Sequence, residues 1–131
     1  MIFLGMGYLI PEKMDARPNA EIEAVMSECQ PHLEKFYDSG NVLIDAGLQL
    51  ETKSLRRVNG KVTVTDGPFT ESKELIGSIF LIEAEDMDEA IQLAALHPTT
   101  QVSSGEDFGW RIEIRPVHYF KINELHKKVI S

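Results

Sequence analysis

The sequence predicts a single α+β domain, and three observations lead to this expectation. The chain has 131 residues, which is close to the usual size of one domain. Short apolar runs alternate with two segments that carry a helical stripe, in the order β-α-β, hairpin, β-α-β. Two split βαβ halves form a ferredoxin-like motif, an antiparallel sheet with both helices on one face. The expected fold is therefore ferredoxin-like βαββαβ with an inserted β-hairpin, which either stands apart or extends the sheet.

The first βαβ half is expected to run from residue 2 to residue 50. Residues 2–8 form an apolar run typical of a strand buried on both faces. Apolar residues then recur at helical spacing from Ile22 to Tyr37, which predicts one helix with its N-cap at Asn19. Pro31 lies inside this pattern, and we expect a bent but continuous helix because the stripe keeps its phase. Residues 42–50 follow as a strand.

Local signals also define the second part of the chain. Asn59-Gly60 lies between two β-like runs, 54–58 and 61–65, and both residues tolerate the positive φ of a tight hairpin turn. Residues 75–84 form the next strand. Asp86 is expected to cap a helix that His97-Pro98 ends, and a polar loop follows. Residues 110–118 alternate between apolar and charged side chains, as a strand with one buried face does.

Composition excludes several classes of function. The net charge is −8, so the chain repels phosphate backbones and anionic lipid, and we expect neither nucleic acid nor a membrane as a partner. The single cysteine, Cys29, cannot form an internal disulfide, which fits a cytoplasmic protein. Cys29 and His32 are too few ligands for a metal site. The sequence lacks a Gly-rich phosphate loop, a nucleophile elbow and a CxxC pair, so we expect no cofactor.

The segment Asp66-Gly67-Pro68-Phe69 is the most unusual local feature. Proline fixes its own φ and forces the preceding residue out of the helical region, so the loop is rigid, and Phe69 can pin it by burying its ring. One interpretation is a connection between two strands. The other is that the rigid loop holds the Asp66 carboxylate at the rim of a pocket.

Residues 65–84, TDGPFTESKELIGSIFLIEA, resemble the signature of the DGPF-domain proteins, which belong to the YCII-related group. The resemblance also includes Pro31-His32-Leu33, the segment ending in His97-Pro98, and Glu113-Ile114-Arg115-Pro116. It covers residues 1–118 and leaves residues 119–131 as a C-terminal tail.

This resemblance implies a domain that dimerises through its sheets into an αβ barrel. It also implies a cleft with a helix histidine and an aspartate as an acid/base pair, which in this chain are His32 and Asp66. Members of the wider group include an enzyme that removes chloride from a chlorinated aromatic ring, and DGPF domains occur beside sigma factors.

Other candidate residues follow from the sequence itself. His32 is either a partly buried histidine of the helix or a general acid/base. His97 either caps the end of its helix as a cation or shares a cleft with His32. Lys73, the one cation among many carboxylates, can bind an anionic group of a ligand, and Phe69 and His97 complete the expected substrate-binding set. Since both helices cover one face of the sheet, a homodimer is expected to bury the other.

Two functional hypotheses remain open at this point. In the first, the chain is a cofactor-independent enzyme of the proton-transfer type, an isomerase or lyase that acts on a small molecule through His32 and Asp66. In the second, it is a non-catalytic module that binds a ligand or a protein, for example in transcription regulation, through the acidic face formed by residues 66–107.

Overall fold

The computed structural model describes residues 1–67 and 73–123. Four strands form an antiparallel sheet in the order β2-β5-β1-β6. Their bounds are β1 (Ile2–Leu9), β2 (Val42–Gly47), β5 (Leu75–Glu83) and β6 (Arg111–Pro116). The two halves interleave, as the ferredoxin-like motif requires: β5 of the second half lies between β2 and β1, and β1 of the first half lies between β5 and β6. The predicted fold class is confirmed.

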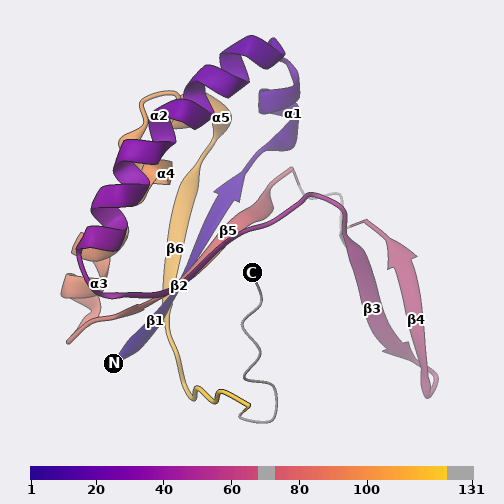
Figure 1. Ribbon diagram of the computed structural model, residues 1–131. Coiled ribbons are helices and arrows are strands. Elements are labelled where there is room, and N and C mark those ends of the chain that lie inside the picture. The colour runs from indigo at the N-terminus through magenta and orange to yellow at the C-terminus, as the bar shows by residue number, and fades with distance from the viewer. Residues whose placement is uncertain (68–72, 124–131) are drawn as a thin grey trace.

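Helices cover one side of this sheet (Figure 1). The long helix α2 (Asn19–Asp38) continues through Pro31 as expected, but its N-cap is Pro18, without a side-chain cap. The prediction of Asn19 as N-cap is therefore wrong by one residue. In α3 (Met87–Ala94) the predicted cap is confirmed, because a carboxylate oxygen of Asp86 accepts a hydrogen bond from the backbone N–H of Glu89 at 2.8 Å.

Three short helices lie in stretches where the sequence predicted no helix. They are α1 (Pro11–Asp15), α4 (Pro98–Gln101) and α5 (Gly105–Phe108). Each spans four or five residues, which is too short to show a helical period in the sequence. The first two begin with proline at the first helical position, where its missing N–H costs nothing.

The hairpin forms a sheet of its own from β3 (Lys53–Val58) and β4 (Lys61–Asp66). Asn59 has a φ of 50° and Gly60 a φ of 79°, so the predicted tight turn is confirmed. The hairpin is an insertion and not an extension of the main sheet. Figure 1 shows that it projects on the side of the sheet opposite the helices.

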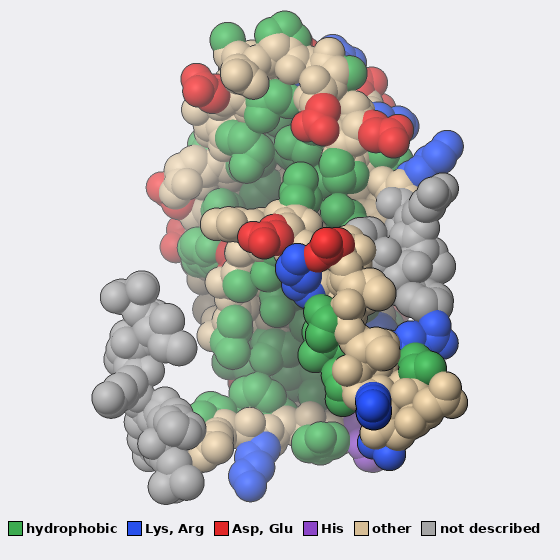
Figure 2. All heavy atoms as spheres, turned by 90° about the vertical axis from the view of Figure 1, so that its right-hand side faces the viewer, with side chains coloured by type: hydrophobic (Ala, Val, Ile, Leu, Met, Phe, Trp, Pro, Cys, Tyr) green, Lys and Arg blue, Asp and Glu red, His purple; other side chains and the backbone are tan. Residues whose placement is uncertain are grey.

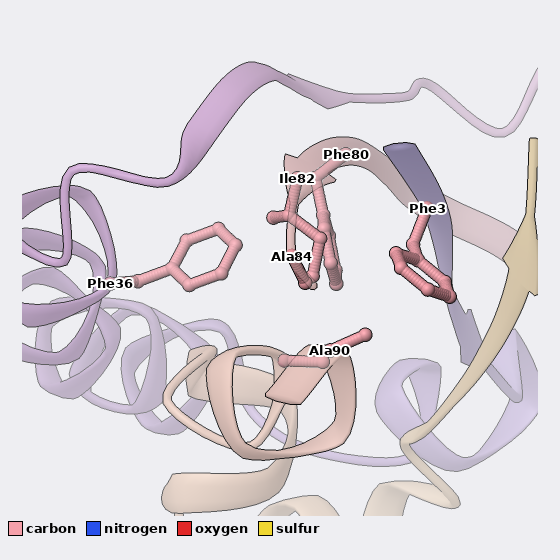
Figure 3. Packing of buried hydrophobic residues seen from close by; sticks show 7 residues of the cluster. Phe3, Phe36, Phe80, Ile82, Ala84 and Ala90 are labelled. Atoms are coloured by element: carbon pink, nitrogen blue, oxygen red, sulfur yellow. The ribbon is translucent and has the colours of Figure 1, made fainter. Parts of the chain in front are cut away.

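The main core lies between the sheet and the helices and is rich in aromatic rings (Figure 3). Phe36 of α2 meets Phe80 of β5 edge to face, with ring centroids 5.0 Å apart. Beside Phe80 lies Gly5 of β1, where an added Cβ would come within 2.1 Å of the Phe80 ring. A glycine in the central strand thus makes room for the largest buried ring of the adjacent strand.

The other face of the sheet is apolar, and no described helix covers it (Figure 2). Leu81 lies between Leu4 and Ile44, and Ile79 lies next to Met6. Ile44 is 48% exposed, whereas the other four side chains are half-buried. The expectation that β1 is buried on both faces is therefore met only on the helix side. β6 presents charged side chains to the open face, as its predicted alternation requires.

Candidate active site

A cavity of about 260 Å³ lies between α2 and one end of the sheet. A cavity of about 150 Å³ with apolar walls is large enough to bind benzene. The space therefore suits one substituted ring or a short aliphatic molecule. It is the place in the described chain where apolar walls and titratable side chains meet, with Tyr8, Cys29, Asp45 and His97 all lining it.

Small residues on three adjacent strands form the floor of the cavity. Ser78 of β5 pairs with Gly7 of β1 on one side and with Gly47 of β2 on the other, so the three lie in one row across the sheet. An added Cβ at Gly7 would lie 2.3 Å from Oγ of Ser78, whereas one at Gly47 would meet nothing within 4 Å. The row of Gly47, Ser78 and Gly7 leaves the space that larger side chains would fill.

The wall opposite the floor comes from α2. Met26, Cys29 and Leu33 lie three and four residues apart, so they share one stripe of the helix. The Sγ of Cys29 donates to the carbonyl oxygen of Val25 at 3.4 Å, and burial raises the pKa of this thiol. Cys29 is thus a protonated, apolar wall residue and not a nucleophile. Met26 is half exposed and marks where the cavity meets solvent.

His97 is the buried histidine at one end of the cavity. Its Nδ1 accepts a hydrogen bond from the backbone N–H of Thr99 at 3.2 Å, which assigns the proton of the neutral ring to Nε2. Burial lowers the pKa of His97, although the nearby Asp45 charge opposes this shift. The His97 ring stacks on the Phe80 ring, with the ring centroids 5.2 Å apart, and meets the Phe36 ring edge to face, with the centroids 5.3 Å apart.

The second nitrogen of His97, Nε2, is not sealed in the core. Among the described residues, no fully buried side-chain nitrogen or oxygen lacks a hydrogen-bond partner, and Nδ1 is satisfied by Thr99. Since no hydrogen-bond partner of Nε2 is found in that part of the chain, Nε2 is not fully buried, and His97 lines the cavity. The prediction that His97 caps the end of its helix as a cation is wrong, because it caps the start of α4 as a neutral ring. Its alternative, a cleft shared with His32, is not formed either.

Asp45 supplies the carboxylate of the cavity. It pairs with Phe80 across β2 and β5, which turns its side chain toward the helices. The hydroxyl of Tyr37 donates a hydrogen bond to Oδ2 of Asp45, and this bond raises the pKa of Tyr37 to about 12. Tyr37 therefore stays protonated at neutral pH and holds the carboxylate in place. Among the described lining residues there is no lysine or arginine, so Asp45 makes the cavity negative.

A charged cluster holds Tyr8 on another side of the cavity. The guanidinium of Arg111 lies 4.1 Å from the centre of the Tyr8 ring and bonds both carboxylate oxygens of Glu74, at 2.7 and 3.0 Å. A hydrogen bond to Glu113 raises the pKa of the Tyr8 hydroxyl. Glu74 follows the loop that begins at Asp66, so this cluster anchors the end of that loop beside the cavity.

The structure does not bring His32 and Asp66 together within one chain. His32 lies half-buried on α2 and is not among the residues that line the cavity. Asp66 ends β4, where its side chain is 89% exposed and forms an ion pair with Lys53. Within the described chain, His97 and Asp45 are the histidine and the carboxylate that line the cavity. A pairing of His32 with Asp66 across two copies of the chain stays a prediction.

The remaining predicted residues of the site differ in their placement. His97 lines the cavity, as a substrate-binding residue should. Lys73 is exposed and does not line it. Phe69 lies outside the described residues. The sequence interpretation missed Asp45 and Tyr37, and the available signal was a lone carboxylate within the otherwise apolar strand VLIDAG.

The family model of the YCII-related domain matches residues 1–110. The chain belongs to the YCII-related family. This confirms the wider group to which the sequence resemblance pointed. The YCII-related domain accounts for both βαβ halves up to the start of β6, and the cavity lies entirely within it.

Two similar proteins add context to the YCII-related domain. The uncharacterized protein R00369 of Rhizobium meliloti (strain 1021) is 29% identical over 127 residues, which cover 95% of this chain and 98% of that protein. The solved structure of 5-chloro-2-hydroxyhydroquinone dehydrochlorinase from Burkholderia phenoliruptrix AC1100, in complex with 2,5-dihydroxybenzoquinone, is 20% identical. It aligns with a TM-score of 0.46 over 91% of this chain and 96% of that one.

Two features of the described residues bear on the expected partners. No described helix has the length and apolar character needed to cross a bilayer. The same residues contain no group of three or more histidine, cysteine or acidic side chains placed to hold a metal ion.

Proposed function

We propose that this YCII-related protein is a cofactor-independent small-molecule enzyme of the proton-transfer type, with His97 and Asp45 as its working pair. The observation that carries the proposal is that a neutral histidine and a carboxylate line the same apolar cavity. Paired groups whose environments favour different protonation states are a recurring arrangement for acid and base roles.

The hydrogen bonds that His97 and Asp45 each make to a neighbouring residue suggest which of them is the acid and which is the base. The Nδ1 of His97 is occupied by the Thr99 N–H, so the group that faces a ligand is the Nε2–H donor. A neutral imidazole of this kind polarises a carbonyl and stabilises the oxyanion that forms when a neighbouring carbon loses a proton. Asp45 is the base that takes this proton, and the Tyr37 hydroxyl orients it.

The charge and size of the cavity define the substrate class. Its described walls carry one carboxylate and no cationic side chain, so carboxylates and phosphates are disfavoured. A space of about 260 Å³ admits about one ring. The proposed substrate is a neutral cyclic ketone or lactone that carries a hydrogen on the carbon next to its carbonyl, with the carbonyl oxygen at His97.

The open face of the sheet supports a homodimer. Antiparallel sheets that face water on one side carry polar residues there, whereas Ile44, Leu81 and Met6 make this face apolar. A second copy placed face to face would bury these side chains.

A ligand screen by thermal shift tests the site, using small neutral ring compounds on the wild type and on two variants. His97→Asn keeps an acceptor for the Thr99 N–H, because asparagine is a good N-cap residue, but removes the Nε2–H. Gly47→Leu fills the cavity from a position where an added Cβ meets nothing. A ligand present at 100 times its Kd stabilises the wild type by about 2.7 kcal/mol, and both variants should lose this effect.

The chemistry is then tested on the ligands that bind. In D2O, the wild type should exchange the carbon-bound protons next to the ligand carbonyl, as followed by NMR, and Asp45→Asn should not. Binding without exchange would favour the ligand-binding module over the enzyme. If stabilisation survives in His97→Asn and Gly47→Leu but is lost in His32→Ala, the site lies at His32 instead.

A further inference from the structure

Among the described elements, the strands of the β3–β4 hairpin pack mainly on each other. It is a two-stranded sheet, and such a hairpin alone is marginally stable in water. Figure 1 shows it apart from the helices, on the side of the open sheet face. Its ordered turn and full register from Lys53–Asp66 to Val58–Lys61 therefore call for a further surface against which it packs.

The two faces of the hairpin differ in character. Leu55 pairs with Val64, and Arg57 pairs with Val62, so the three aliphatic side chains share one face. Leu55, Val62 and Val64 are 68%, 65% and 60% exposed. The opposite face carries Thr63 and Thr65 on the same strand. An aliphatic patch on one face of a projecting hairpin is typical of a surface that docks against protein.

The charge of the hairpin differs in sign from that of the rest of the molecule. Residues 53–66 contain four of the 13 cationic side chains and a single carboxylate, giving a net charge of +3. Since the whole chain carries −8, the remaining residues carry −11. A surface with the composition of this chain outside the hairpin is thus electrostatically complementary to the hairpin.

We infer that the β3–β4 hairpin is a dimerisation arm that packs its aliphatic face against a second copy of this chain. This inference rests on the homodimer of the proposed function and goes beyond it. A second copy placed on the open sheet face lies on the side to which the hairpin projects. In a two-fold dimer each copy gives one arm and receives one, so two basic arms meet two acidic bodies.

A matched pair of variants on one strand tests the arm. Val62→Asp/Val64→Asp places two charges on the aliphatic face, and Thr63→Asp/Thr65→Asp places the same two charges on the opposite face. The dimer Kd, measured by sedimentation equilibrium, should rise at least about 100-fold in the first variant, because two buried aliphatic contacts are lost. It should change by less than about 5-fold in the second.

Limited trypsin digestion of the unmodified chain provides a second readout that does not depend on how a variant folds. Cleavage at Arg57 and Lys61 should be slow at protein concentrations above the dimer Kd and fast below it, whereas cleavage at Lys35 of α2 serves as the reference. A wild type that is monomeric at all concentrations would overturn the dimer and the arm together. An intact dimer with an unaffected Val62→Asp/Val64→Asp variant and concentration-independent cleavage overturns the arm alone. The acid/base proposal is judged separately by the exchange experiment.

Discussion

The contact between Gly5 and Phe80 gives a quantitative test of how the core supports the candidate site. In Gly5→Ala the new Cβ would lie 2.1, 2.2 and 2.6 Å from three atoms of the Phe80 ring. This ring is fully buried between Phe36 and His97, so it cannot swing away into solvent. The variant therefore overpacks the core at the point where the core touches the cavity.

Two opposing effects set the magnitude. Overpacking a well-packed core costs about 1–3 kcal/mol, whereas replacing glycine by alanine lowers the entropy of the unfolded chain and returns about 0.4–1 kcal/mol. We expect Gly5→Ala to lower the free energy of unfolding by about 1–2 kcal/mol. For a domain of this size, the corresponding fall in Tm is about 3–8 °C.

Urea denaturation with Gly47→Ala as the control measures this effect. Gly47 lies on the same side of the sheet, but an added Cβ meets nothing there, so the control should be unchanged or slightly more stable. Adding Phe80→Leu to Gly5→Ala should recover part of the loss, which a double-mutant cycle reports as coupling. Equal stabilities of Gly5→Ala and Gly47→Ala, with no coupling to Phe80→Leu, would refute the reasoning.

Three further predictions concern titratable groups at the cavity. Because burial holds the pKa of His97 below its unfolded value of about 6.5, the unfolded chain binds the extra proton first. The neutral His97 ring therefore contributes to stability above pH 6.5, and this contribution is lost below pH 6.5 by up to about 1.4 kcal/mol per pH unit. Urea titrations at several pH values should show this slope in the wild type and not in His97→Asn. One tyrosine should titrate near 12 in ultraviolet spectra, and in Asp45→Asn this ionisation of Tyr37 should move toward about 10; an unchanged titration would contradict the hydrogen bond. Cys29 should react with a small neutral thiol reagent at least about tenfold more slowly in the folded chain than in urea, because burial raises the pKa of its thiol; equal rates would show that the wall is open.

The elements that the sequence predicted correctly have local causes. The Asn59-Gly60 turn, the Asp86 cap and the alternation of β6 each depend on residues within a few positions of one another. The stripe of α2 likewise identified the helix, although the first turn begins after Pro18 instead of an asparagine cap. Local chemistry decides these features, so one sequence is enough to find them.

The candidate site depends on contacts between distant parts of the chain. Gly7, Gly47 and Ser78 form a floor only because β1, β2 and β5 pair in one register, which no local pattern specifies. Asp45 becomes a functional candidate only when that register turns it toward His97, some 50 residues later in the chain. The sequence motif drew attention to Asp66 instead, whose carboxylate pairs with Lys53 on the hairpin.

The isolation of Gly47 has a consequence for how this protein can diversify. A Cβ added at that position would extend into the binding space without displacing a neighbour, since nothing lies within 4 Å of it. A single substitution at Gly47 can thus change the size of the ligand that the cavity accepts while the fold is kept. Most proteins must trade stability for a new specificity, and at this one position the architecture separates the two.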